Sequence, residues 1–193
     1  MDLRQKLFES RSYIPIPFLA IMLFFAKPTL ATLIAGFALV AGGELFRLWG
    51  VAIAGSETRT TGPVGGTFLI TTGPFGYVRN PLYVGNILIY VGVGIMSHAL
   101  FPWIALFALV YFFWQYSMIV SLEEEHLAVK FGDEYRRYSE AVPRFLLSFK
   151  RYQPGMNAQP ELDWKRGLKS ERRTLQAIGI LTAVLLVLWK VRV

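Results

Sequence analysis

Long apolar runs, separated by short polar stretches, dominate the chain. Five of them stand out, at residues 14–26, 30–54, 82–96, 100–120 and 175–189. The hydrocarbon core of a bilayer is about 30 Å thick and takes roughly 20 helical residues to cross. The second and fourth runs reach that length. The other three reach it with their flanking residues, because arginine side chains can extend to the interface. The pattern predicts an all-α fold, a polytopic membrane helical bundle of about five transmembrane helices.

The polar residues between the runs predict the orientation of this bundle. With the N-terminus in the cytoplasm, 17 of the 20 Lys and Arg residues lie on the cytoplasmic side, and Lys27, Lys190 and Arg192 lie outside. Such a basic excess marks the cytoplasmic face of membrane proteins. The net charge of +7 is thereby explained by membrane orientation, and we expect no nucleic-acid partner.

The composition also excludes several kinds of site. The chain has no cysteine, which rules out disulfides, thiolate metal sites and cysteine nucleophiles. Its two histidines, His98 and His126, are far apart in the sequence, so we predict no histidine-based metal site.

One ionisable pair falls inside an apolar run. Glu44 and Arg47 are three residues apart in the second run, a spacing that places them on one helix face. Ionisable groups at membrane depth indicate function by default. A structural ion pair, in which each side chain neutralises the charge of the other, explains them equally well.

Two polar clusters at the membrane boundary outline a candidate site. In the first, a glycine-rich turn and Arg79 precede the third run; the second covers residues 121–125, where the fourth run ends. The predicted topology puts both on the cytoplasmic side, one on each leg of a helical hairpin. Asn80 and Pro81 are favoured at the start of a helix and explain that start without any function. The free amides of a helix N-terminus, together with Arg79, can also hold a carboxylate.

The second cluster contains three consecutive glutamates, Glu123, Glu124 and Glu125. A charged run where a helix leaves the membrane is usually solvated, but a cytoplasmic flank normally carries Lys and Arg. Successive residues of a helix point about 100° apart, so at most two of the three can face one pocket. Their carboxylates suit hydroxyl groups, an amine or a sulfonium cation. His126 is an alternative candidate for a base.

The sequence after the glutamates predicts a segment outside the membrane. The fourth helix should continue to Phe131, because no proline or glycine interrupts it after Pro102, and Gly132 should end it. Asp133 can cap a short helix at 134–141, followed by an apolar stretch at the membrane surface and a linker at 152–170. We predict three parts: residues 1–29 with the first transmembrane helix, a core at 30–151, and the linker and last helix at 152–193.

These residues resemble those of the integral-membrane methyltransferases that include isoprenylcysteine carboxyl methyltransferase and the phospholipid N-methyltransferases. The shared pattern is Gly-Pro-Phe-x-Tyr-Val-Arg-Asn-Pro-x-Tyr-x-Gly at 73–85 and Glu-Glu at 123–124, with Phe-Gly-x-Glu-Tyr-x-x-Tyr at 131–138 and Val-Pro-Arg-Phe at 142–145. Order, spacing and the intervening hairpin agree over roughly residues 43–147.

The resemblance implies that S-adenosylmethionine binds in a cytoplasm-facing pocket, closed by the segment after the glutamates. The acceptor it implies is lipid-like or isoprenoid, a carboxylate or an amine that enters from the bilayer. By the same analogy, Arg79 orients the acceptor or the carboxylate of the cofactor, and Glu124 is a candidate base for an amine. The implied cofactor contacts are Thr67, Phe68, Leu69, Ile70, Phe75, Asn80, Pro81, Leu82, Tyr83, Glu123 and Glu124.

The chain departs from the isoprenylcysteine pattern at two positions. Many of those enzymes have histidine in place of Asn80, and they carry an arginine one turn before the glutamates, where this chain has Ile119. We therefore keep the acceptor open. Two other functions compete with the methyltransferase: an NADPH-dependent membrane reductase of the sterol-reductase type, and a non-catalytic membrane protein on the same scaffold.

Overall fold

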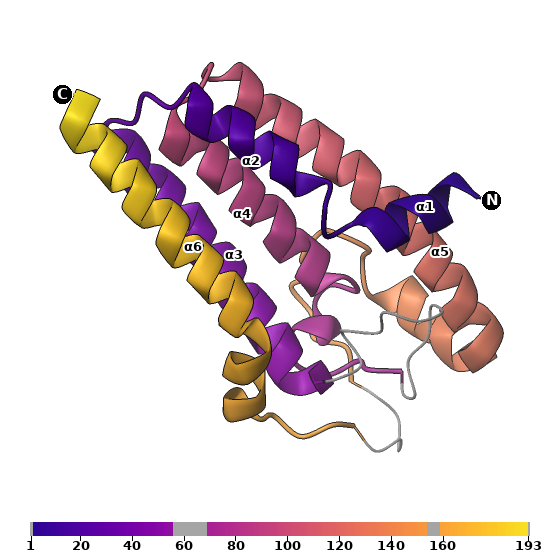
Figure 1. Ribbon diagram of the computed structural model, residues 1–193. Helices are drawn as coiled ribbons and strands as arrows, with labels where there is room; N and C mark the ends of the chain where they lie inside the picture. Colours follow the sequence, from indigo (N-terminus) through magenta and orange to yellow (C-terminus); the bar gives the residue numbers. More distant parts are fainter. Residues whose placement is uncertain (1, 56–68, 154–158, 193) are drawn as a thin grey trace.

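The computed structural model describes residues 2–55, 69–153 and 159–192, and within these ranges every regular element is a helix. Figure 1 shows the long helices running along a common direction, with α6 beside α3. This confirms the predicted all-α fold. The elements are α1 Leu3–Ser10, α2 Pro15–Phe24, α3 Leu30–Ala54, the 3₁₀ helix η2 Gly73–Gly76, α4 Pro81–Ser97, α5 Trp103–Ala141 and α6 Trp164–Arg192.

Three of the described helices, α3, α5 and α6, are long and apolar enough to cross a membrane. Helices α1 and α2 pass the same test together and form a fourth span if the pair, bent by 58°, is counted as one. Helix α4 is apolar but shorter, at 17 residues. The chain is therefore an integral membrane protein of multi-pass design. The count of about five spans and the cytoplasmic N-terminus stay predictions.

Helices α3 and α4 form the closest packing in the bundle. A Cβ atom on Gly36 would stand 2.4 Å from the carbonyl oxygen of Gly92, and one on Gly43 would stand 2.7 Å from that of Gly85. Two glycine pairs therefore let the backbones touch, as small residues commonly do between membrane helices. This contact fixes the start of α4 relative to the end of α3.

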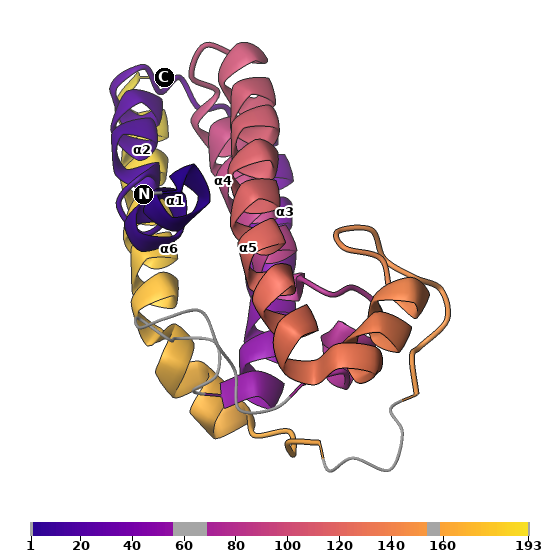
Figure 2. The ribbon, with the colours of Figure 1, turned by 90° about the vertical axis from the view of Figure 1, so that its right-hand side faces the viewer.

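Helix α5 continues well past its apolar part, as predicted. It carries the glutamates on a regular helical stretch and then turns sharply at Gly132, whose φ of 51° and ψ of −124° are not helical. Figure 2 shows the last turns of α5 swinging away from the bundle at this point. The helix predicted at 134–141 is the part of α5 that follows the turn.

The predicted linker at 152–170 is wrong in its second half, because α6 begins at Trp164. The carboxylate of Asp163 accepts from the backbone N–H of Arg166 at 3.0 Å and caps the helix. The N–H of Asp163 donates to the carbonyl of Ala52 at 2.9 Å, and Arg166 Nη2 donates to the same carbonyl at 3.3 Å. The start of α6 thus satisfies a backbone carbonyl that α3 leaves unpaired at its end. This tertiary contact stabilises a stretch whose own composition looked like a linker.

Candidate functional site

The turn before α4 depends on one glycine. Gly73 has a φ of +59°, and a Cβ atom there would lie 2.8 Å from Cγ1 of Ile53, so both backbone conformation and space exclude a side chain. Asn80 occupies the cap position of α4 but does not cap it. Its Nδ2 donates instead to the carbonyl of Arg144 at 3.1 Å. Asn80 therefore links the turn to the tail, the name we give to residues 142–153.

The three consecutive glutamates of α5 point to three different places. Oε1 of Glu123 accepts from the hydroxyl of Tyr83, at the start of α4, at 2.8 Å. Glu124 points to the turn, and Glu125 pairs with Arg4 of α1. The structure thus brings two of the glutamates to the turn and the start of α4, and assigns the third to contact with α1.

Glu124 lies between two arginines. Arg79 Nε donates to its Oε1 at 2.9 Å, and Arg144 donates through Nε and Nη2 to its Oε2 at 2.9 and 2.5 Å. Arg79 Nη1 also donates to the carbonyls of Ser139 and Val142, at 2.6 and 2.7 Å. The side chains of Arg79 and Glu124 are each 12% exposed, whereas that of Arg144 is 42% exposed. The buried pair is held on several sides, and Arg144 is the member that can move into solvent.

The tail lies along the turn through backbone contacts. The N–H of Ser148 donates to the carbonyl of Tyr77 at 2.8 Å. The hydroxyl of Tyr138, just beyond the Gly132 bend, donates to the carbonyl of Phe75 at 2.8 Å. Burial raises the pKa of Tyr138 above its usual range, so the hydroxyl keeps the proton that it donates. The segment after the glutamates therefore closes over the turn.

The cofactor contacts implied ahead of the turn are only partly visible. Thr67 and Phe68 lie outside the described residues. Leu69 is buried in a small cluster with residues at the end of α5, and Ile70 beside it is half-buried. Leu69 is therefore part of the closed packing under the tail.

Two further implied contacts face α3. Pro81 and Leu82 lie 3.7 and 3.5 Å from the place where a Cβ on Gly50 would stand. The predicted residues that gather around the glutamates are Arg79, Asn80 and Tyr83. Phe75 contacts Tyr138 instead, through its backbone carbonyl.

The position at which the resembling enzymes carry an arginine is part of the apolar core here. Ile119 is fully buried among core residues. One turn earlier, the Gln115 side chain is also fully buried, and its amide has no hydrogen-bond partner among the described residues. Neither position therefore supplies a guanidinium to meet a substrate carboxylate.

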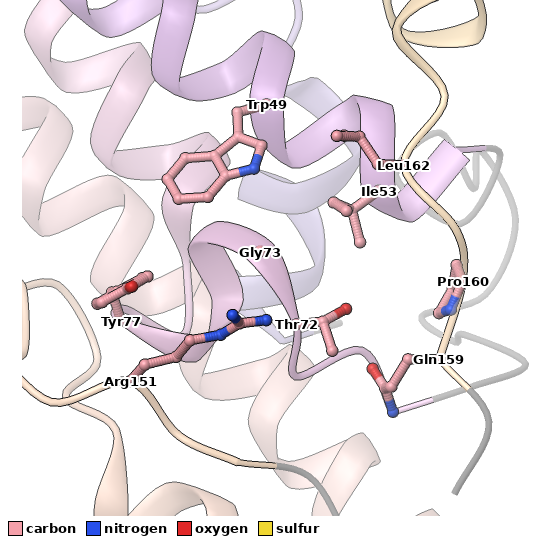
Figure 3. A pocket seen from close by; sticks show the side chains of 9 residues that line it. All are labelled: Trp49, Ile53, Thr72, Gly73, Tyr77, Arg151, Gln159, Pro160 and Leu162. Atoms are coloured by element: carbon pink, nitrogen blue, oxygen red, sulfur yellow. The ribbon is translucent and has the colours of Figure 1, made fainter.

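A pocket of about 360 Å³ opens on the turn (Figure 3), lined by Gly73 and Tyr77 of the predicted motif and by residues that the sequence did not single out. Its walls come from the last two turns of α3, from the turn, from the tail and from the segment before α6. They include Trp49, Ile53, Arg151 and Leu162. Arg151 was counted only toward membrane orientation, because a lone arginine in a basic stretch gives no other signal.

A second charged cluster lies between α3, α4 and α6. Arg47 donates through Nη2 to Glu171 at 2.6 Å, hydrogen bonds to Asn86 through Nη1, and lies 3.4 Å from Oε2 of Glu44. The Glu44 and Glu171 side chains are 7% and 2% exposed. The predicted pair of Glu44 and Arg47 exists, but its main partner is Glu171, which sequence spacing could not reveal. Among the described residues, no group of three or more His, Cys, Asp or Glu could hold a metal ion.

Comparison with known proteins matches the part of the chain that carries the turn and the glutamates. A family model described as phospholipid methyltransferase matches residues 31–134, just over half of the chain. The matched segment runs from α3 to the bend of α5. It contains the turn, Arg79, Tyr83 and the glutamates, and it ends before the tail and α6.

Two curated relatives are similar over part of their length. The cobalt-zinc-cadmium resistance protein CzcN of Cupriavidus metallidurans is 33% identical over 120 residues, which are 62% of this chain and 50% of the relative. The nickel-cobalt-cadmium resistance protein NccN of Alcaligenes xylosoxydans xylosoxydans is 35% identical over 79 residues, 41% of this chain and 36% of the relative. The chain thus spans half or less of the curated relatives it matches. No solved structure shows a significant match.

Proposed function

This chain belongs to the phospholipid methyltransferase family, and from that premise we propose that it is an S-adenosylmethionine-dependent methyltransferase. Its acceptor is a lipid-like or isoprenoid molecule that enters from the bilayer. The observation that carries the proposal is the meeting of the two ends of the α4–α5 hairpin. Tyr83 at the start of α4 hydrogen bonds to Glu123, and Arg79 pairs with Glu124, within the segment that matches the family.

The chemistry of these residues fits the cofactor. S-adenosylmethionine carries a sulfonium cation, an amino group and two ribose hydroxyls, and each of these can be bound by a carboxylate oxygen. Glu123 presents such a carboxylate at the edge of the bundle, oriented by the Tyr83 hydroxyl at 2.8 Å. The aromatic rings of Tyr83 and Tyr116, with centroids 4.8 Å apart, form an apolar wall beside it. We assign Glu123, Glu124, Tyr83 and Asn80 to the cofactor.

When bound, the cofactor supplies an activated methyl group, so the protein's task is alignment and exclusion of water. The tail serves this purpose, because its backbone contacts with the turn close the polar end of the bundle. Arg144 is its mobile member and would uncover Glu124 when it moves into solvent. Arg79 positions Glu124 and orients the acceptor or the cofactor carboxylate.

The acceptor can be a carboxylate or an amine. A carboxylate attacks without a base, whereas an amine must lose a proton, and Glu124 is the residue we assign to receive it. Because Ile119 is buried where related enzymes place an arginine, a carboxylate acceptor would need a different partner in this chain. The active site faces the cytoplasm, as the distribution of Lys and Arg favours.

The test is titration of S-adenosylmethionine into the full chain, purified in detergent, with transfer of labelled methyl groups to a lipid extract as a second readout. Glu123→Gln and Tyr83→Phe change the proposed contact and keep its shape. Glu125→Gln is the matched control, because Glu125 faces α1 instead. We expect Tyr83→Phe to weaken binding at least about tenfold, as loss of a hydrogen bond to a charged group does, and Glu125→Gln to leave it unchanged.

Each outcome has a distinct meaning. If the parent chain does not bind S-adenosylmethionine, the methyltransferase proposal fails. If all variants bind equally, the function stands and the placement of the site is wrong. Binding of NADPH in place of S-adenosylmethionine would support the reductase.

A further inference from the structure

The pocket beside the turn (Figure 3) shares no side chain with the proposed methyl-transfer site. The transfer site uses Asn80, Tyr83 and the glutamates. The pocket is lined instead by Trp49 and Ile53 of α3, by the turn, and by Arg151 and Leu162. It needs its own explanation.

The polar groups of the pocket suit an anion. In Figure 3 the guanidinium of Arg151 lies under the turn and points toward Thr72. Arg151 has no ion pair or hydrogen bond from its side chain to any described residue. The Thr72 hydroxyl is buried without a hydrogen-bond partner in the described part of the chain. The indole nitrogen of Trp49 stands 3.4 Å from the place of a Cβ on Gly73. None of the described residues that line the pocket is acidic.

The backbone beside Arg151 and the aliphatic part of its exposed side chain are positioned before any ligand arrives. The N–H of Tyr152 donates to the carbonyl of Gly76 at 2.9 Å, which fixes the backbone next to Arg151. The aliphatic part of the arginine packs on Gly76, where a Cβ would stand 3.3 Å from its Cγ. Across the pocket, the Gln159 side chain accepts from the N–H of Thr71 at 2.9 Å. A side chain whose aliphatic part is already packed loses less conformational entropy on binding than a wholly free one.

The rest of the lining is apolar and lies where the bundle meets water. Ile53 and Trp49 belong to the last two turns of α3, a membrane-spanning helix, and Leu162 and Pro160 complete the wall. A ligand here places its charge against Arg151 and its apolar part against the end of α3. An amphiphile can contact both Arg151 and the apolar wall, whereas a free anion can contact only Arg151.

We propose that this pocket binds the anionic headgroup of an amphiphile, a phosphate or a carboxylate, at a site separate from methyl transfer. Arg151 and the Thr72 hydroxyl contact the head, and Ile53 and Leu162 contact the first part of the chain. The site goes beyond the proposed function and does not depend on it. Arg151 lies outside the segment that matches the family.

Binding of dodecyl phosphate to the full chain in neutral maltoside micelles tests this, with tryptophan fluorescence as the readout. We expect Arg151→Gln to weaken binding at least about tenfold, as loss of a charge-assisted contact does, and Arg151→Lys to fall between. Lys150→Gln removes the neighbouring charge and should leave affinity within about twofold. Trp49→Phe should remove most of the fluorescence change, which would place the ligand at this pocket.

Three results would overturn the proposal. If the parent and Arg151→Gln bind dodecyl phosphate with equal affinity, Arg151 does not contact the anion. Equal binding of dodecyltrimethylammonium shows that charge is not recognised, and inorganic phosphate binding as tightly as dodecyl phosphate shows that the apolar wall plays no part.

S-adenosylhomocysteine, titrated into the same preparations, separates the two sites. If Arg151→Gln lowers its affinity as much as that of dodecyl phosphate, the pocket belongs to the cofactor and a separate lipid site is excluded. If dodecyl phosphate binds and S-adenosylhomocysteine does not bind any variant, the proposed function fails and this site remains.

Discussion

Two buried charged clusters in this molecule have opposite composition. At the polar end, one carboxylate, Glu124, lies between two guanidinium groups, Arg79 and Arg144. Inside the bundle, one guanidinium, Arg47, lies between two carboxylates, Glu44 and Glu171. The first cluster joins a turn, a helix and the tail. The second joins membrane helices that are far apart in the sequence.

The two clusters also differ in how far their side chains are exposed, and this suits them to different purposes. The polar-end cluster has one member, Arg144, that is 42% exposed, so it can open without moving a helix. In the bundle, all three charged side chains are at most 13% exposed, and any rearrangement must separate helices. A partly exposed network suits a site that must open. A fully buried network suits a fixed contact between helices, and we call the cluster of Glu44, Arg47 and Glu171 the joint between α3 and α6. Four substitutions test this contrast.

Arg47→Leu should have the largest effect. It removes the cation that lies between two buried carboxylates, and removal of one partner from a buried pair costs about 3–5 kcal/mol. The measurement is thermal unfolding of the purified chain in detergent. Arg172→Leu, next to Glu171 but exposed, is the control and should change stability little. A small effect of Arg47→Leu would show that the cluster is not a joint.

Arg79→Leu should have a smaller and more local effect. Glu124 keeps Arg144 as a partner, but the carbonyls of Ser139 and Val142 lose their donor, at a cost of about 1–3 kcal/mol. We expect faster trypsin cleavage in the tail and weaker cofactor binding, with a smaller loss of global stability than for Arg47→Leu. Arg136→Leu, an arginine 70% exposed in a surface pair, should change neither. Unchanged cleavage would mean that the tail is held by its backbone contacts alone.

Arg144→Gln should cost less than about 1 kcal/mol, because partly exposed ion pairs contribute little. The remaining effect should shrink as salt is raised, since salt screens exposed charges. Unfolding at low and high sodium chloride measures both quantities. A loss as large as that of Arg79→Leu would contradict the view that Arg144 is the mobile member.

Glu44→Gln should have the smallest effect, within about 1 kcal/mol and in the direction of stabilisation. Both oxygens of Glu44 are buried without a hydrogen-bond partner in the described structure, and Glu171 already pairs with Arg47 at 2.6 Å. Replacing a surplus buried charge by a neutral group of the same shape is often neutral or favourable. If Glu44→Gln destabilised as strongly as Arg47→Leu, both carboxylates would be required.

Local pattern in the sequence was enough to predict most of the helices and one half of the site. Apolar length predicted the long helices, Gly132 predicted the bend in α5, and the motif around Arg79 predicted the turn and the start of α4. Local pattern could not show that Glu124 also meets Arg144, because a bond between residues 20 positions apart depends on how the chain turns. For the same reason the start of α6 was missed, since its capping of α3 is a tertiary contact. The predicted roles of Arg79 and Glu124 stay predictions.

The joint between α3 and α6 also bears on how the chain is made. Glu171 is synthesised 124 residues after Arg47. Helix α3 therefore enters the bilayer long before the main partner of Arg47 exists. Glu44, three residues from Arg47 on the same helix, is the counter-ion available during that interval. The carboxylate that is surplus in the finished bundle can therefore neutralise the arginine while the protein is being inserted. A variant without Glu44 would then lose yield in the membrane while the molecules that do assemble keep their full stability.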